Sequence, residues 1–406
     1  MHILRGEAKL VKIFVPRVFG CRHQFVSIVS MKMTKYPYPI WPWQLSQGFP
    51  WPRLQFLRVP DPFRLDSGDD LPELLLAYEE WGQVGKGLPV IIFHALTGDS
   101  HVARHTYQDH PGWWDKMVGY GKPIDLHQYH VIALNVLGGA MGTTGPHSLA
   151  HDGHPFGARF PKISLYDMAR AAKILADVVL GFNRKPVVIG GSMGGMMAYA
   201  YALLYPDSIL GTMGIGAPIY HSPWAIAFHT VGRQAITTDP DFNGGNYYLT
   251  GSYPRQGLAV ARMTDMISYQ SPQSMESKFG RSYQTSEHDE FQITSYLRYQ
   301  GQKLVRRFDA NSYIRLTEAM DHFDLRQRDL SRMKNVPVWM VGISTDQLYP
   351  PDEIRSHAEL LRESGIKVSL ETLRSPWGHD SFLVDIRPMG KILRKFIETV
   401  THAVVE

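Results

Sequence analysis

Three residues have the types and the chain order that covalent acyl chemistry needs, a serine, then an acid, then a histidine. Ser192 lies in "GGSMGG", Asp346 in "GISTDQLYPP" and His379 in "SPWGHDSF". An imidazole that removes the hydroxyl proton makes a serine nucleophilic, and a carboxylate orients that imidazole and stabilises its charged form. We therefore predict Ser192 as the nucleophile, His379 as the general base and Asp346 as the orienting acid.

The residues around Ser192 predict a turn that exposes it. "KPVVIGG" has the short apolar run of a strand, a helical segment follows, and Gly190, Ser192 and Gly194 form GxSxG at the junction. The amide of Met193 at the helix start, and that of Leu96 in "IIFHALTGDSH", are the expected oxyanion donors. A phosphate-binding loop is excluded, because the chain has no GK[ST] sequence.

The segments that must position these residues alternate between strand and helix patterns. Short apolar runs predict strands at 88–96, 129–137, 185–191 and 336–346. Helical spacing predicts helices at 164–182, 350–365 and 390–404. This alternation predicts an α/β fold, with a mostly parallel sheet and helices on both faces. We expect one core, residues 63–218 and 335–406, interrupted by a helical lid at 219–334.

The positive charge of the chain lies at its N-terminal end. Residues 1–33 carry six basic residues against one acidic residue, a net charge of +5, and the rest of the chain, with 36 basic and 37 acidic residues, carries −1. A nucleic-acid-binding protein would carry its excess charge on the folded body, so we expect no nucleic-acid partner. We expect residues 1–33 to be a disordered basic tail, a transit peptide or the product of a misassigned start, with Met31 and Met33 as alternative starts.

Other features of the sequence indicate the structure of the lead-in, the cellular location of the protein and whether it binds a metal. Residues 34–62 form a lead-in rich in proline and aromatic residues, which favours extended backbone over helix. Cys21 is the only cysteine, which excludes an intrachain disulfide, and no apolar run is long enough for a membrane helix, so we expect a cytoplasmic protein without a membrane partner. The histidine groups 94/101/105 and 147/151/154 lack an HExxH motif or a cysteine pair, and we expect no metal.

Longer motifs give a resemblance that covers the chain from "FRLDSG" to the last predicted helix. The segments are "HALTGDSHV", "PGWWDKMVGYGKPID", "NVLGGAMGTTGP", "GGSMGG", "VGRQAI", "FNGGNYY", "LAVARM", "SYLRYQGQKLVRRFDANSY", "TDQLYPP" and "SPWGHDSF". With these segments the sequence resembles the homoserine O-acyltransferases, α/β-hydrolase-fold enzymes of methionine biosynthesis that usually take acetyl-CoA. Several of the matches lie inside the expected lid, so they are far more specific than GxSxG alone.

The resemblance implies the activity and further site residues. It implies transfer of an acetyl group from acetyl-CoA, as co-substrate, to L-homoserine, with Ser192, Asp346 and His379 as the triad. It implies Arg233 and Asp380 as contacts to the amino-acid acceptor, where a guanidinium suits the carboxylate and an aspartate suits the ammonium. Beyond these small-molecule substrates, we expect a homodimer through the lid and no cofactor.

The sequence leaves open other substrates for the transferase and other classes of protein. The chain departs from the family at Tyr120, Ala140, Thr143 and Met197, which leaves succinyl-CoA as donor and L-serine as acceptor open. A carboxylester or thioester hydrolase would use the same triad with water as acceptor. A non-catalytic binding protein on the same fold would be expected to have lost part of the triad, and all three residues are present.

Overall fold

Each predicted catalytic residue lies in the segment that follows a strand of the central sheet. The computed structural model describes residues 8–15, 24–33, 35–285 and 290–402. Within them, ten strands form one sheet in the order β1-β2-β3-β6-β10-β7-β11-β12-β13-β14. The strands are β1 (Ala8–Val15), β2 (Gln24–Met33), β3 (Gln55–Val59), β6 (Leu74–Gly82), β7 (Leu88–Phe93), β10 (Tyr129–Leu134), β11 (Val187–Gly191), β12 (Gly211–Ile215), β13 (Val338–Ile343) and β14 (Val368–Leu373). From β10 to β14 all neighbouring strands pair parallel, and from β1 to β10 they pair antiparallel.

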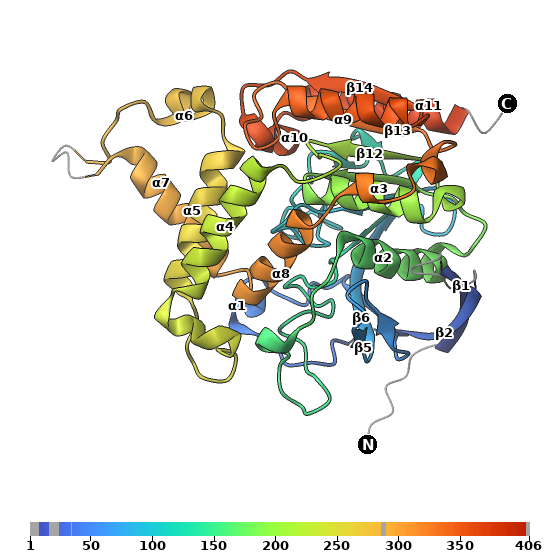
Figure 1. Ribbon diagram of the computed structural model, residues 1–406, viewed down its shortest axis with the longest axis horizontal. Coiled ribbons are helices and arrows are strands. Elements are labelled where there is room, and N and C mark those ends of the chain that lie inside the picture. The colour runs from blue at the N-terminus through green and yellow to red at the C-terminus, as the bar shows by residue number, and fades with distance from the viewer. Residues whose placement is uncertain (1–7, 16–23, 34, 286–289, 403–406) are drawn as a thin grey trace.

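The parallel strands are buried on both faces. In β7, Ile91 and Phe93 point into one hydrophobic core, while Val90 and Ile92 point into another. The first core is closed by α2 (Leu165–Leu180), α3 (Met193–Leu204) and α9 (Pro351–Glu363), and the second by α11 (Ile386–His402). A strand buried on both faces needs a continuous apolar run, which is the pattern the sequence shows. The predicted α/β fold, with helices on both faces of the sheet, is confirmed (Figure 1).

A group of helices lies between β12 and β13. They are α4 (Pro223–Thr237), α5 (Arg255–Tyr269), α6 (Pro272–Phe279), α7 (Gln292–Val305) and α8 (Ala310–Asp321). Helices α4, α5 and α7 pack side by side at the edge of the molecule away from β1 and β2 (Figure 1). No helix in the described residues is both long and apolar enough to cross a bilayer.

The N-terminal region differs from the sequence expectation. A disordered tail was one of the expectations for residues 1–33, yet Ala8–Val15 and Gln24–Met33 form an antiparallel pair, and Met33 of β2 pairs with Phe56 of β3. Both segments are rich in β-branched and aromatic residues, a strand signal that the charge count obscured. Cys21 lies outside the described residues.

Short elements complete the chain outside the sheet and the helices already described. The lead-in contains one turn of helix, α1 (Pro42–Leu45), where we expected extended backbone. Its Pro42 is at the first helical position, which costs no hydrogen bond. Besides several 3-10 turns, the other short elements are β4 (Phe63–Arg64), β5 (Asp70–Leu71), β8 (Val118–Gly119), β9 (Ile124–Asp125) and α10 (Ser381–Val384).

Candidate active site

Ser192 occupies the sharp turn between β11 and α3. Its backbone has φ 56° and ψ −126°, a conformation that costs a non-glycine residue free energy. The two flanking glycines of GxSxG make the turn possible, because a Cβ atom on Gly190 would lie 2.1 Å from the backbone of Gly194, and one on Gly194 would lie 2.2 Å from the carbonyl oxygen of Phe93. The strain and the close packing fit a serine held out at the end of the sheet.

Asp346 and His379 form a buried pair. Asp346 follows β13, and its Oδ1 accepts hydrogen bonds from the backbone amides of Leu348 and Tyr349 at 2.9 and 3.0 Å. Its Oδ2 accepts from Nδ1 of His379 at 2.6 Å. Both side chains are almost fully buried. The carboxylate is therefore fixed by the backbone and, in turn, fixes the tautomer and orientation of the imidazole.

The imidazole of His379 lies next to the turn that carries Ser192. The Ser192 amide donates to the carbonyl of Ile215 at 2.8 Å, and a Cβ atom on the next residue, Gly216, would lie 3.2 Å from Cε1 of His379. Nε2 of His379 is buried and has no hydrogen-bond partner among the described residues. The nitrogen that a general base needs is thus unoccupied, in a ring that lies near the turn of the predicted nucleophile.

Charge around His379 favours its protonated form. Burial acts to lower the pKa of His379, but the charge and hydrogen bond of Asp346 and the charge of Asp380 outweigh it, so this pKa is raised. Burial raises the pKa of Asp380 itself. The carboxylates stabilise the imidazolium that forms when the base takes a proton.

The two predicted oxyanion donors lie on adjacent segments. Met193 is the first residue of α3, so its amide has no acceptor within the helix. Leu96 is in the loop after β7, and the backbone of Phe93 and His94 at the start of this loop packs against Gly194 of α3. The structure therefore places the loop of Leu96 against the helix start of Met193.

Arg233 of α4 is held by a carboxylate that the sequence analysis did not identify. Its Nη2 lies 2.7 Å from Oδ2 of Asp321 at the end of α8. Oδ1 of Asp321 accepts from Nδ1 of His221 at 2.9 Å and from Nδ1 of His229 at 2.7 Å. Nε2 of His221 lies 2.7 Å from the hydroxyl of Tyr349. These contacts join segments far apart in the sequence. Arg233 and Tyr349 lie in the family motifs "VGRQAI" and "TDQLYPP", whereas no motif contains His221, His229 or Asp321.

The Asp321 contacts lead back to the triad. The ring of Tyr349 lies 5.3 Å, edge to face, from that of His379. Nη1 of Arg233 is buried and has no hydrogen-bond partner among the described residues. Since a guanidinium can bind a carboxylate, this free nitrogen suits the predicted role of Arg233.

Asp380 lies on the lid-facing side of the base. Its Oδ2 accepts from Nε2 of Gln270 at 3.1 Å, just after α5. The ring of Tyr269 lies 5.6 Å from that of His379, tilted by 40°, and the guanidinium of Arg262 lies over Tyr269. No hydrogen bond or ion pair among the described residues joins Arg233 and Asp380. The two residues predicted to bind the amino-acid acceptor therefore do not pair with each other.

Two clusters in the described residues have the donor types of a metal site. One is Glu79, His101 and His105, and the other is His221, His229 and Asp321. Each is held by direct hydrogen bonds between carboxylate and imidazole. Of the histidine groups noted in the sequence, only residues 101 and 105 come together here. The absence of a metal stays a prediction.

The positions that depart from the family lie in varied surroundings. Thr143 has a structural role, since its Oγ1 accepts from the amide of Ala77 and donates to the carbonyl of Asn135 at 2.9 and 2.7 Å. Tyr120 is 63% exposed, and Met197 is fully buried. None of these contacts reaches the triad.

Comparison with known proteins places the chain among enzymes. A family model described as alpha/beta hydrolase fold matches residues 89–386. The chain is 44% identical over 357 residues to a homoserine O-acetyltransferase of Acidiphilium cryptum, covering 84% of this chain and 93% of that protein. The crystal structure of homoserine O-acetyltransferase from Bacillus anthracis superposes with a TM-score of 0.76 at 23% identity, over 84% of this chain and 97% of that chain.

A second solved structure has the same fold and another printed activity. Esterase E22 also gives a TM-score of 0.76, at 24% identity, over 84% of this chain and 99% of that chain. At such identities the likeness shows the fold alone, and it covers a transferase and an esterase equally. The fold therefore does not distinguish acyl transfer from hydrolysis. Only the sequence similarity bears on that distinction.

Proposed function

We propose a reaction from the premise that this chain belongs to the homoserine O-acetyltransferase family and is an acyltransferase with the α/β-hydrolase fold. The enzyme moves an acetyl group from acetyl-CoA to the hydroxyl of L-homoserine, through an acyl-enzyme on Ser192, as a step of methionine biosynthesis. The observation that carries the proposal is the buried pair of Asp346 and His379, with Nε2 of the imidazole unoccupied and the ring next to the residues that bind the strained turn of Ser192.

The first half-reaction acylates the serine. Nε2 of His379 takes the proton of the Ser192 hydroxyl as Oγ attacks the thioester carbonyl carbon. The amides of Leu96 and Met193 donate to the oxyanion that develops. The intermediate collapses, the carbon–sulfur bond breaks, and the CoA thiolate leaves with the proton that His379 returns.

The second half-reaction transfers the acyl group to the acceptor. The homoserine hydroxyl gives its proton to Nε2 of His379 and attacks the ester carbonyl of the acyl-enzyme. The ester bond to Ser192 breaks, and the proton returns to Oγ. Arg233, with its free Nη1, binds the acceptor carboxylate, and Asp380 binds the ammonium. No cofactor is needed, because acetyl-CoA supplies the activated acyl group.

Hydrolysis is the rival reaction, because water can resolve the same intermediate. The arginine and aspartate give an amino acid two fixed charges to bind, which water does not need. Helices α4 to α8 cover the site and limit the access of water. Within transfer, succinyl-CoA and L-serine remain the alternative substrates.

A product assay tests the proposed reaction. Purified enzyme is incubated with acetyl-CoA or succinyl-CoA, crossed against L-homoserine or L-serine, and products are separated by mass spectrometry. We expect O-acetylhomoserine in excess over free acetate. Free acid as the main product in every combination would make the chain a hydrolase, and O-acetylserine or a succinyl ester would change the substrate assignment.

We also propose that two copies associate through the lid in the cytoplasm. Helices α4, α5 and α7 expose large apolar side chains, namely Trp224, Val231, Val260, Ile267 and Tyr299. Such a group of exposed apolar side chains is typical of a protein interface. Light scattering is expected to give the mass of a dimer, and a monomer at micromolar concentration would contradict the association.

A further inference from the structure

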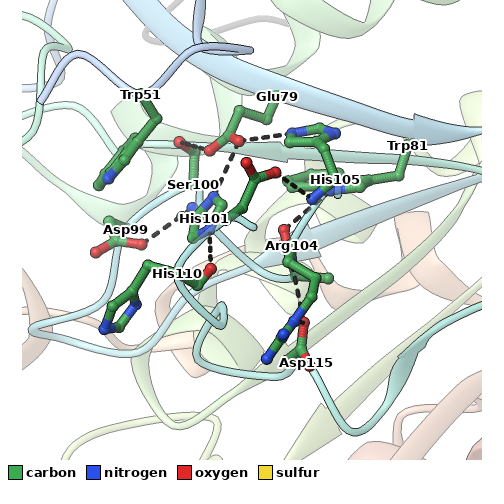
Figure 2. Close-up of polar contacts among 12 residues, drawn as sticks. Trp51, Glu79, Trp81, Asp99, Ser100, His101, Arg104, His105, His110 and Asp115 are labelled. Carbon is green, nitrogen blue, oxygen red and sulfur yellow. Dashed lines mark hydrogen bonds and ion pairs between the residues drawn. The ribbon is translucent and has the colours of Figure 1, made fainter. Parts of the chain in front are cut away.

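The loop that carries Leu96 is tied at its far end to a buried carboxylate (Figure 2). Glu79 of β6 is fully buried, and both of its oxygens accept hydrogen bonds from this loop. Oε1 accepts from the hydroxyl of Ser100 at 3.0 Å. Oε2 lies 3.1 Å from Nδ1 of His101 and 2.8 Å from Nε2 of His105. Every one of these partners belongs to the segment after β7, so Glu79 connects that segment to the sheet.

The charge of Glu79 is balanced by an imidazolium. His101 lies between two acceptors, because its Nδ1 faces Glu79 and its Nε2 lies 2.9 Å from the carbonyl oxygen of His110. Both ring nitrogens therefore carry protons. Burial acts to lower the pKa of His101, and the hydrogen bond and charge of Glu79 raise it to about 9. Among the described residues no lysine or arginine pairs with Glu79.

Aromatic rings hold the two imidazoles in place. Trp51 stacks on the ring of His101 at 5.4 Å, and Trp81 stacks on that of His105 at 4.7 Å with an angle of 4° between the planes. Figure 2 shows both indoles flanking the contacts of Glu79. The imidazoles cannot turn away from the carboxylate without losing this stacking.

Further hydrogen bonds fix the loop between Leu96 and the carboxylate. The guanidinium of Arg307 donates to the carbonyl of Thr97 at 2.6 Å, one residue beyond Leu96. The amide of Ser100 donates to Oδ1 of Asn135 at 3.0 Å. The backbone around Leu96 is therefore held from both sides, by the lid through Arg307 and by the sheet through Glu79.

We infer that Glu79, paired with His101, is a positioning residue that keeps the amide of Leu96 directed at the oxyanion. The inference rests on the proposed function and deepens it, because it explains how the donor is held. Donors that stabilise a transition state must be in place before the reaction, and a displacement of about 1 Å can cost roughly 100-fold in rate.

Glu79→Gln tests the role, because it keeps the shape of the side chain and removes the charge that pairs with His101. The probe is p-nitrophenyl acetate, whose burst of nitrophenol reports acylation of Ser192 whatever the natural donor. We expect acylation to slow roughly 10- to 100-fold. KM should change less than about two-fold, because the oxyanion contacts form in the transition state.

Glu80→Gln is the matched control. Glu80 is the next residue of β6, on the opposite face, and it also accepts from a buried histidine, Nε2 of His130 at 2.8 Å. This pair does not touch the loop after β7. We expect a comparable loss in the free energy of unfolding for both variants, and slower acylation only in Glu79→Gln.

The possible results separate the inference from the proposed function. Equal slowing in both variants, or normal acylation in Glu79→Gln, would overturn the positioning role. If Glu79→Gln does not fold, Ser100→Ala is the second variant, because it removes one hydrogen bond to the Glu79 carboxylate. We expect it to slow acylation several-fold. Unchanged acylation in Ser100→Ala would also overturn the positioning role. One equivalent of a transition metal bound by the wild-type protein and lost in Glu79→Gln would place a metal where the imidazolium pair is inferred and would overturn the role. Ester acylation without any product from acyl-CoA would overturn only the proposed function.

Discussion

Two buried clusters join one carboxylate to two histidines, and their charges are arranged differently. The Glu79 cluster comprises Glu79, His101 and His105. The Asp321 cluster comprises Asp321, His221, His229 and Arg233. The first holds the loop of Leu96, the proposed oxyanion donor, and the second holds the guanidinium proposed to bind the acceptor.

Burial and the neighbouring charges differ between the clusters and determine which side chain carries the positive charge. In the Asp321 cluster Arg233 is a permanent cation, and His221 lies between Asp321 and the hydroxyl of Tyr349, which can donate to it. Burial lowers the pKa of His221 to about 4. His101 has two acceptors and no competing cation on its carboxylate, and its pKa rises to about 9. The same residue types thus give a neutral histidine in one cluster and a charged one in the other.

The largest expected effect comes from changing the cation of the Asp321 cluster. Arg233→Lys removes the planar fork that binds a carboxylate, so we expect the homoserine step to slow roughly 10- to 100-fold, equivalent to the ~1.5–3 kcal/mol of a hydrogen bond to a charged group. Acylation of Ser192 by acetyl-CoA should stay nearly normal, because it does not use the acceptor. Rapid-quench measurement of both half-reactions checks this.

Arg315→Lys is the control for this prediction. Arg315 lies on α8 and pairs with Glu318, with a side chain that is exposed to a similar degree. It should leave both half-reactions unchanged. Equal damage to both steps in Arg233→Lys would indicate a folding role for Arg233 instead.

A smaller effect is expected when the carboxylate of the same cluster is neutralised. Asp321→Asn leaves Arg233 in place but removes the charge that orients it, so the homoserine step should slow about 10-fold or less. Steady-state kinetics should show a higher KM for homoserine with an unchanged KM for acetyl-CoA. A change in the KM for acetyl-CoA alone would show that the Asp321 cluster does not act on the binding of homoserine.

The Glu79 cluster predicts a pH dependence of stability. The folded-state pKa of His101 is raised from 6.5 to about 9, so its contribution is complete below pH 6.5 and is lost as the pH rises through about 9. The free energy of unfolding, measured by urea titration, should fall over this range. In Glu79→Gln the loss should be much reduced, and the same alkaline fall in variant and wild type would contradict the assignment of charge.

The smallest effect is spectroscopic and leaves the protein unchanged. At pH 7.5, nitrogen NMR of the histidine rings should show His101 as the imidazolium and His221 as the neutral ring. Assignment uses His101→Gln and His221→Gln. If His101 and His221 were in the same protonation state, the proposed difference in charge between the two clusters would be wrong.

The sequence predicted the parallel strands of the sheet and the chain order of the candidate catalytic residues because both depend on local patterns. Ser192 has its glycines within two positions, and the strands are continuous apolar runs. The two clusters depend on contacts that span 22 to 100 positions, between Glu79 and His101 and between His221 and Asp321. Nothing local marks Glu79 or Asp321. His101 lies in the family segment "HALTGDSHV" and in a histidine group where no metal was expected, and neither observation predicted its contact with Glu79.

The two N-terminal strands were missed although their sequences carry a local strand pattern. Charge was given more weight than hydrophobic content there, although "LVKIFV" and "FVSIV" are ordinary strand sequences. A strand of a mixed sheet can carry basic residues along an edge, as β1 does with Lys9 and Lys12. Net charge therefore gives little information about whether a segment folds.

Mass spectrometry of Ser192 tests the central claim most directly. The enzyme is mixed rapidly with acetyl-CoA in the absence of homoserine, quenched with acid and digested. We predict one added acetyl group on the peptide that contains Ser192, none in Ser192→Ala, and loss of the label with formation of O-acetylhomoserine when homoserine is added. An unlabelled Ser192 in an enzyme that forms O-acetylhomoserine at full rate would contradict the acyl-enzyme mechanism.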